Sequence, residues 1–111
     1  MSTTSAKTPP PTWTLTRGDG PGQVILAGEI DFSSTPEVRL RLLEAMDNDA
    51  PEIVLSLAKL VYVDSSGLAL FIEARKHLAE TGRTIRIADI SPQVGKLFSL
   101  TQLGGLFGLP E

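Results

Sequence analysis

Residues Val61–Ile72 limit the possible fold of this chain more than any other stretch of its sequence. The β-prone run Val61-Tyr62-Val63 stops at Asp64-Ser65-Ser66-Gly67, and an apolar, helix-forming run follows at once. Short Asp and Ser side chains accept hydrogen bonds from the free N–H groups of a helix's first turn. The pattern therefore predicts a strand, a tight turn and a helix, with Ser65 or Ser66 at the positive end of the helix dipole.

The two hydroxyls at this turn are better candidates for being modified than for catalysis. A serine without a neighbouring base is a poor nucleophile. The single histidine, His77, lies on the same predicted helix as Ser65, about 18 Å along its axis. No Ser-His-Asp arrangement can be built from local spacing, so a hydrolase is not expected. Helix capping is the simplest interpretation of the serines, and a phosphate acceptor is the functional alternative.

The residues after the serines raise the functional alternative. Gly67 costs about 1 kcal/mol inside a helix, and a glycine lets a partner's backbone or a phosphate approach closely. Leu68–Ile72 is apolar on every side of the predicted helix, which is typical of a buried helix. We expect any side that the domain itself leaves uncovered to contact a partner.

Composition excludes several classes of function. The net charge of −3 argues against binding of a nucleic-acid backbone. The absence of cysteine excludes disulfides and thiol chemistry, and one histidine without an acidic cluster of metal-loop spacing predicts neither a metal site nor a cofactor. No apolar run approaches the roughly 20 residues that span a bilayer. Residues 1–12 lack the apolar core of a signal peptide, so we expect a disordered tail, no membrane insertion and a cytoplasmic location.

The rest of the chain alternates strand and helix signals. The expected strands are Trp13–Arg17, Gln23–Glu29 (a central strand, because both its faces are mostly apolar), Ile53–Leu57 and Thr84–Asp89, with a possible last one at Leu106-Phe107. The expected helices begin near Pro36, after Asp64 and at Ser91-Pro92, and they end at Asp47, about Glu80 and Gly104-Gly105. The Gly-rich turn 18–22 joins the first two strands into a hairpin, and it lacks the Lys and the following helix of a phosphate-binding loop.

This order predicts an α/β domain over residues 13–111, with a small mixed sheet of four to five strands. Strands joined through a helix are parallel and connected right-handedly. Their helices pack against the sheet, here three main helices mainly on one side. Phe32 and Tyr62 are interpreted as core or edge packing, and Arg39, Arg41, Arg75 and Lys76 as solvated helix faces.

Three blocks in this order resemble the STAS domain, and more narrowly the bacterial anti-sigma factor antagonists. They are Gly28-Glu29-Ile30-Asp31, then Val63-Asp64-Ser65-Ser66-Gly67-Leu68, then Ser91-Pro92-Gln93-Val94 running into Leu97-Phe98 and Leu103–Phe107. The second block is the specific one. The resemblance runs from about Trp13 to Leu109 and implies the mixed sheet expected above.

The resemblance also implies a function as a switch rather than an enzyme. In that family the antagonist binds an anti-sigma factor that is also an ATP-using serine kinase, and binding frees a sigma factor. The kinase phosphorylates the serine after the motif's Asp, here Ser65, and a PP2C-type phosphatase reverses the step. We expect the partner surface to include Glu29, Asp31, Asp64, Ser65, Ser66, Gly67 and Leu68, in a monomer or weak dimer.

Two other functions share this sequence pattern. One is a STAS subunit that supports the ATPase of an ABC-type lipid transporter, because Gly67-Leu68-Ala69-Leu70 also suits that group. The other is a scaffold component of a larger sensory assembly. The second serine and the Ser91-Pro92 block favour the antagonist.

Overall fold

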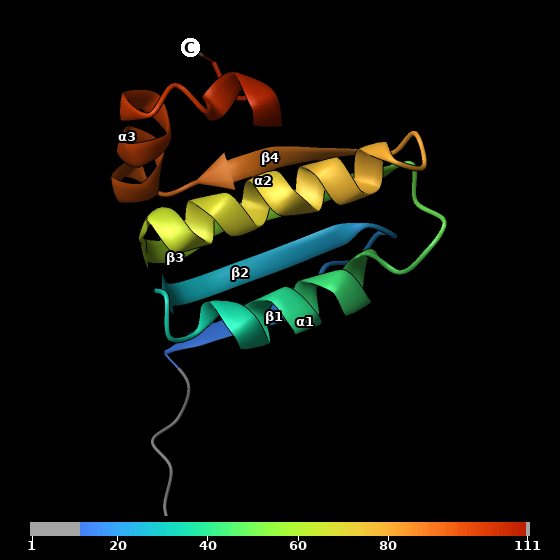
Figure 1. The fold of residues 1–111 in the computed structure, drawn as a ribbon, viewed down its shortest axis with the longest axis horizontal. Helices are drawn as coiled ribbons and strands as arrows, with labels where there is room; N and C mark the ends of the chain where they lie inside the picture. The colour runs from blue at the N-terminus through green and yellow to red at the C-terminus, as the bar shows by residue number, and fades with distance from the viewer. Residues whose placement is uncertain (1–11, 111) are drawn as a thin grey trace, which may run out of the picture.

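The computed structural model describes residues 12–110 as a four-stranded sheet (Figure 1). The strands are β1 (Trp13–Arg17), β2 (Gln23–Ile30), β3 (Glu52–Val63) and β4 (Thr84–Ile90), and their order in the sheet is the order in the chain. β1 and β2 are antiparallel, whereas the strands joined through helices are parallel. The predicted hairpin, mixed sheet and interior position of β2 are confirmed. The tail predicted over residues 1–12 lies, apart from Thr12, outside the described residues, and Thr12 O accepts from Glu29 N at 2.8 Å.

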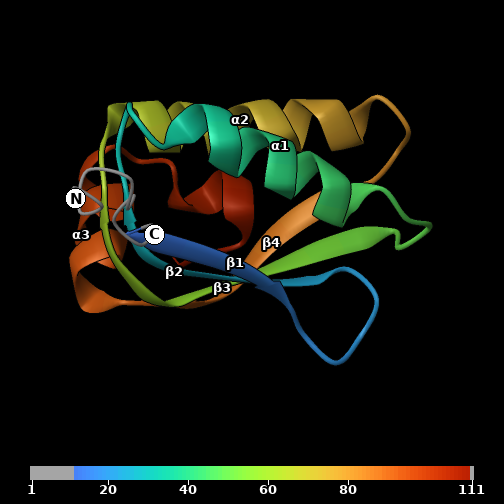
Figure 2. The ribbon, with the colours of Figure 1, turned by 90° about the horizontal axis from the view of Figure 1, so that it is seen from below.

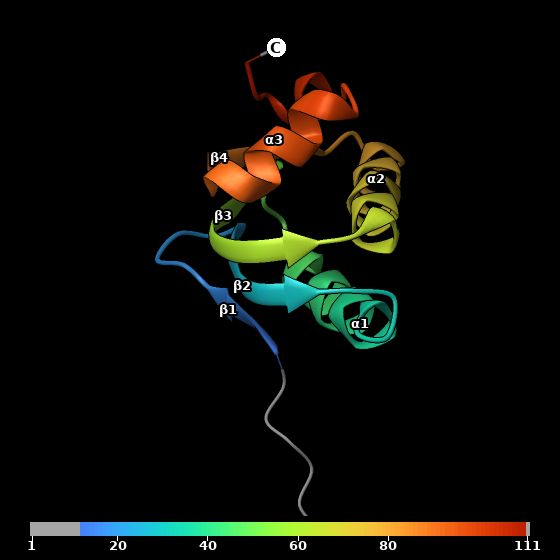
Figure 3. The ribbon, with the colours of Figure 1, turned by 90° about the vertical axis from the view of Figure 1, so that its left-hand side faces the viewer.

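Two helices cover one face of this sheet. α1 (Thr35–Met46) and α2 (Ser65–Ala79) lie side by side over it, and the opposite face carries no helix in the described part of the chain (Figures 2 and 3). α3 (Pro92–Leu100) and the 3₁₀ helix η2 (Gly104–Phe107) follow β4 and cover the core on the β4 side of the sheet (Figures 1 and 3). Stacking of Phe71 on Phe98 (6.3 Å between ring centres) and the edge contact of Phe98 with Phe107 (5.7 Å) join α2, α3 and η2.

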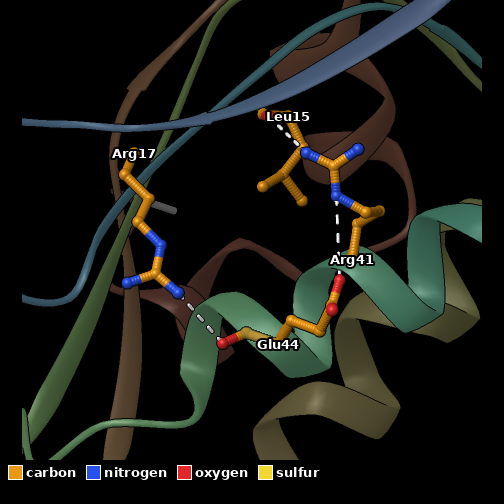
Figure 4. A network of polar contacts seen from close by, with 4 residues as sticks. All are labelled: Leu15, Arg17, Arg41 and Glu44. Carbon is orange, nitrogen blue, oxygen red and sulfur yellow. Dashed lines mark hydrogen bonds and ion pairs between the residues drawn. The ribbon is translucent and has the colours of Figure 1, made fainter.

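β1 is tied to α1 by two arginines (Figure 4). Arg41 Nη2 donates to Leu15 O at 3.2 Å, and Arg17 Nη2 donates to Glu44 O at 3.2 Å. Arg41 was expected on a solvated helix face. Its side chain is indeed about half exposed, but its guanidinium also binds the strand, so it contributes to docking α1 on the sheet.

β3 joins the predicted strand Ile53–Leu57 and the β-prone run Val61–Val63 into one strand, and two β-bulges interrupt its pairing with β2. At the first bulge, Ile25 of β2 lies opposite Ser56 but Ala27 lies opposite Lys59. At the second bulge, Gly28 lies opposite Leu60 but Glu29 lies opposite Tyr62. Each shift inserts one extra residue into β3. Leu57, Leu60 and Val63 are consequently buried at intervals of three, with the exposed pairs Ala58–Lys59 and Val61–Tyr62 between them.

The C-terminal segment also differs from the expectation. α3 ends at Leu100 rather than at Gly104-Gly105, because Gln102 takes a left-handed φ of 59° and Leu103 N donates to Phe98 O. The expected strand at Leu106-Phe107 is the 3₁₀ helix η2 instead, and Phe107 is fully buried in it.

Ser91 fixes α3 to the bulged end of β3. Its side chain is only 5% exposed, and its hydroxyl donates to Leu60 O at 2.5 Å while accepting from Val94 N at 3.3 Å.

We expect Ser91→Ala to lower the free energy of unfolding by about 1–3 kcal/mol, because it removes a helix cap and leaves a buried carbonyl without its donor. Urea unfolding measures this loss. The exposed Ser99 on the same helix is the control, and Ser99→Ala should stay within about 0.5 kcal/mol. Equal stability of the two variants contradicts the assignment.

Candidate functional site

The two serines lie where the parallel strands end and the helices begin. β2 runs into the loop before α1, and β3 runs directly into α2, so both turns meet at one end of the molecule (Figures 1 and 3). Asp64 N donates to Ile30 O at 3.2 Å, which joins the residue after β3 to the last residue of β2. This end holds Glu29, Asp31, Asp64 and both serines, which are five of the seven residues expected in the partner surface.

Asp64 is the centre of this end. As the N-cap of α2, its Oδ1 accepts from Ser66 N (3.0 Å), Gly67 N (3.2 Å) and Ser66 Oγ (2.5 Å). Its Oδ2 accepts from Phe32 N at 3.0 Å. One carboxylate therefore caps α2 and also holds the loop that precedes α1. The cap is Asp64 itself and neither of the two serines.

Asp31 organises its own loop in the same way. Its Oδ1 accepts from Ser33 N (2.9 Å), Ser33 Oγ (2.6 Å) and Ser34 N (3.2 Å). Ser34, the N-cap of α1, makes no side-chain cap to the helix, and its hydroxyl instead accepts from Asp31 N at 3.0 Å. The polar groups of this loop are thus used within the loop and by Asp64.

These hydrogen bonds keep both carboxylates charged. The hydroxyl of Ser66 lowers the pKa of Asp64, and the backbone N–H groups of Gly67, Phe32 and Ser66 lower it further. The hydroxyl of Ser33 is the main cause of the lowered pKa of Asp31. A carboxylate with a lowered pKa is a weak base, so Asp64 is poorly suited to take a proton from a neighbouring hydroxyl.

The two serines occupy different environments. Ser66 is half-buried, and its hydroxyl donates to Asp64. Ser65, the first residue of α2, is exposed, and within residues 12–110 its hydroxyl takes part in no hydrogen bond. Of these two serines, only Ser65 presents a hydroxyl without a hydrogen bond to another of the described residues. The N–H groups of Ser66 and Gly67 already donate to Asp64, so a phosphate on Ser65 would not find these two donors free.

Gly67 and Leu68 lie beneath this surface. A Cβ on Gly67 would come within 2.2 Å of Val63 Cγ2, so only glycine fits where α2 crosses β3. Leu68 is buried, as are Leu70 and Phe71, and only Ala69 is exposed between Leu68 and Ile72. The apolar first turns of α2 therefore belong mostly to the core. Their burial leaves Gly67 and Leu68 to support the surface, while Glu29, Asp31, Asp64, Ser65 and Ser66 form it.

The sequence did not single out the exposed hydrophobic side chains at this end. Phe32 is 76% exposed, and Val61 and Tyr62 are 49% exposed each. Phe32 and Tyr62 were interpreted as core or edge packing, which their exposure contradicts. The β-bulge at Val61 turns both strand residues outward, and a bulge gives no signal in the sequence of one strand.

Other kinds of site are not found among residues 12–110. No group of three or more His, Asp or Glu side chains there could hold a metal ion. No helix in the described range is long and apolar enough to cross a membrane. His77 is exposed near the C-terminal end of α2, and Ser65 begins that helix, as the spacing predicted.

Comparison with known proteins gives one family. The model of the STAS domain matches residues 12–110. An anti-sigma-B factor antagonist of Staphylococcus epidermidis is 30% identical over 89 residues, which cover 80% of this chain and 82% of that protein. An anti-sigma factor antagonist from Mycobacterium paratuberculosis shares the fold with a TM-score of 0.75 at 21% identity, over 93% of this chain and 89% of that one. The phosphorylated form of SpoIIAA, a Bacillus cell fate determinant, has a TM-score of 0.61 at 22% identity, over 85% and 86% of the two chains.

The lowered pKa of Asp64 predicts a pH-dependent contribution to stability. A depressed folded-state pKa stabilises the fold above the unfolded pKa, near pH 4, and this contribution is lost as the pH falls through the folded value. Asp64→Asn keeps a good helix cap but does not titrate. We expect the variant to be less stable than the wild type near pH 7, and the difference to shrink below about pH 4. Urea unfolding of both proteins between pH 7 and pH 2 measures it. Asp31 titrates in both, so its contribution cancels, and a pH-independent difference argues against the assignment.

Proposed function

Because the chain belongs to the STAS domain family, with anti-sigma factor antagonists among its relatives, we propose that it binds an anti-sigma factor and thereby frees a sigma factor. The anti-sigma factor is a serine kinase that uses ATP, and its substrate in this chain is Ser65. The chain is then a substrate and a switch, not an enzyme, and it acts in the cytoplasm as a monomer or weak dimer. A PP2C-type phosphatase restores the unmodified form.

One observation carries the choice of Ser65. Its hydroxyl is exposed and free of hydrogen bonds within the described residues, whereas the hydroxyl of Ser66 is held by Asp64 at 2.5 Å. In the transfer, Ser65 Oγ attacks the γ-phosphorus of ATP, the new O–P bond forms, and the bond to ADP breaks. The proton goes to a base on the kinase, because both Asp64 oxygens already accept hydrogen bonds and its pKa is lowered.

Like charge explains why the modified chain leaves its partner. The acceptor oxygen lies about 3–3.5 Å from the γ-phosphorus before transfer, so the phosphoserine afterwards faces the phosphates of ADP. It adds a charge of about −1.5 to −2 at pH 7 at an end where Asp31 and Asp64 are already ionised. A loss of about 3 kcal/mol weakens binding roughly 150-fold, which suffices for a switch.

The relatives named above favour this function over the two alternatives. They are anti-sigma factor antagonists, and nothing in residues 12–110 points specifically to a transporter ATPase or a sensory scaffold. We therefore propose only the antagonist function.

The acceptor assignment predicts which serine becomes labelled. The purified chain is incubated with each anti-sigma factor serine kinase of its native host and labelled ATP, and phosphate is mapped by mass spectrometry. We expect labelling of wild type and Ser66→Ala, and at least about 100-fold slower labelling of Ser65→Ala, because it lacks the attacking oxygen. Ser66→Ala is the matched control, since it removes a hydroxyl one residue away. Labelling of Ser66, or of neither serine by any of these kinases, overturns the proposal.

A further inference from the structure

Three exposed hydrophobic side chains lie at the same end of the molecule as Ser65. Among residues 12–110, six large hydrophobic side chains are exposed: Phe32, Leu40, Val61, Tyr62, Leu100 and Leu106. Three of them, Phe32, Val61 and Tyr62, lie within four residues of Ser65 or are hydrogen-bonded to its neighbour Asp64. We call these three residues the Tyr62 patch. Half of the exposed large hydrophobic side chains of residues 12–110 therefore lie at the end that carries Ser65, and exposed apolar surface gathered in one place is characteristic of interaction sites.

The backbone builds this patch in two ways. The second β-bulge of β3 exposes Val61 and Tyr62 together, whereas an alternating strand would expose only one of them. Phe32 sits in the loop before α1, where its N–H donates to Asp64 Oδ2 at 3.0 Å. That bond fixes the backbone while the ring remains 76% exposed. The patch is thus held in place before any partner arrives, which reduces the ordering cost of binding.

The patch lies close enough to Ser65 to fall within an interface of ordinary size centred on that serine. At about 3.3 Å per residue along a strand, Tyr62 is at most about 10 Å from Ser65 and Val61 at most about 13 Å. A standard protein interface buries about 800 Å² on each partner, which is a disc of roughly 16 Å radius. An interface of this size centred on Ser65 is therefore wide enough to include Tyr62, and Phe32 lies at the same end through its bond to Asp64.

On the basis of the proposed function, we propose that the Tyr62 patch is the docking surface through which the kinase holds this chain. The partner surface that fits it has an apolar pocket for the Tyr62 ring. It also carries basic side chains opposite Glu29, which pairs with Tyr62 in register and is exposed beside it. Aromatic side chains are common among the few residues that dominate interface affinity.

This assignment separates affinity from switching. The patch holds the partner without taking part in the transfer, and Ser65 alone carries the reacting oxygen. A change at Tyr62 therefore weakens binding and raises the KM for phosphorylation, but leaves kcat unchanged, because the transition state and the bound ground state lose the same contact. A merely structural role for Tyr62 would change stability and would not produce this division between KM and kcat.

The test uses a purified anti-sigma factor serine kinase of the native host that phosphorylates the wild-type chain. We expect Tyr62→Ala to raise both Kd and KM at least about 10-fold with kcat within about 2-fold, and Tyr62→Phe to stay within about 3-fold of wild type. Leu106→Ala is the matched control. Leu106 is 39% exposed, and its carbonyl accepts from Arg75 Nε, about 15 Å along α2 from Ser65. Thermal unfolding of each variant establishes that it is folded.

The outcomes distinguish the two proposals. If no host kinase binds or phosphorylates the wild type, the proposed function fails. If the wild type is bound and phosphorylated while folded Tyr62→Ala keeps the wild-type Kd and KM, only the docking surface is wrong. If Tyr62→Ala does not fold, Val61→Thr is used, which changes one exposed side chain on the same bulge. An unchanged Kd and KM for that variant, together with an unchanged Kd and KM for Phe32→Ala, also overturns the docking surface.

Discussion

The hydrogen bonds of Asp64 hold together the end of the molecule that carries Ser65. A single carboxylate caps α2 through the N–H groups of Ser66 and Gly67, holds the Ser66 hydroxyl, and fixes the loop before α1 through Phe32 N. These bonds have two consequences. They use the Ser66 hydroxyl and leave Ser65 free, so the two adjacent serines are chemically unequal. They also hold the Phe32 backbone beside the start of α2, while the phenylalanine ring stays exposed.

Packing and recognition are divided between neighbouring residues of the same segments. In β3, Leu57, Leu60 and Val63 enter the core while the bulges turn the residues between them outward. In the first turns of α2, Leu68, Leu70 and Phe71 pack inward below the exposed Ser65. Close packing at Gly67, where no Cβ fits against Val63, keeps the start of α2 against the strand. A rigid core of this kind lets a surface group be modified without a change of fold.

Local chemistry accounts for what the sequence alone predicts. Caps, Gly-Pro turns and apolar periodicity act over a few residues, so the strand–turn–helix at 61–72, the hairpin and the order of elements follow from the chain itself. The bulges of β3 depend on pairing with β2, and the end of α3 depends on a left-handed Gln102, which no glycine signals. The role of Asp64 depends on Phe32, 32 residues away. The bulges and the role of Asp64 could therefore not be predicted because a distant part of the chain decides them, whereas the end of α3 is a local turn that lacks its usual glycine. The exposure of Phe32 and Tyr62 belongs with these failures, because an aromatic residue in a strand or turn is ordinarily assigned to packing.

In the proposed switch, a phosphate on Ser65 alone decides whether this surface holds its kinase. Calorimetric titration of the kinase, in the presence of Mg-ADP, with the unmodified chain and with the chain carrying phosphoserine at position 65 tests it most directly. The account predicts that the phosphorylated chain binds at least about 100-fold more weakly, with both forms equally folded. Affinities equal within about 3-fold for the two forms would contradict it.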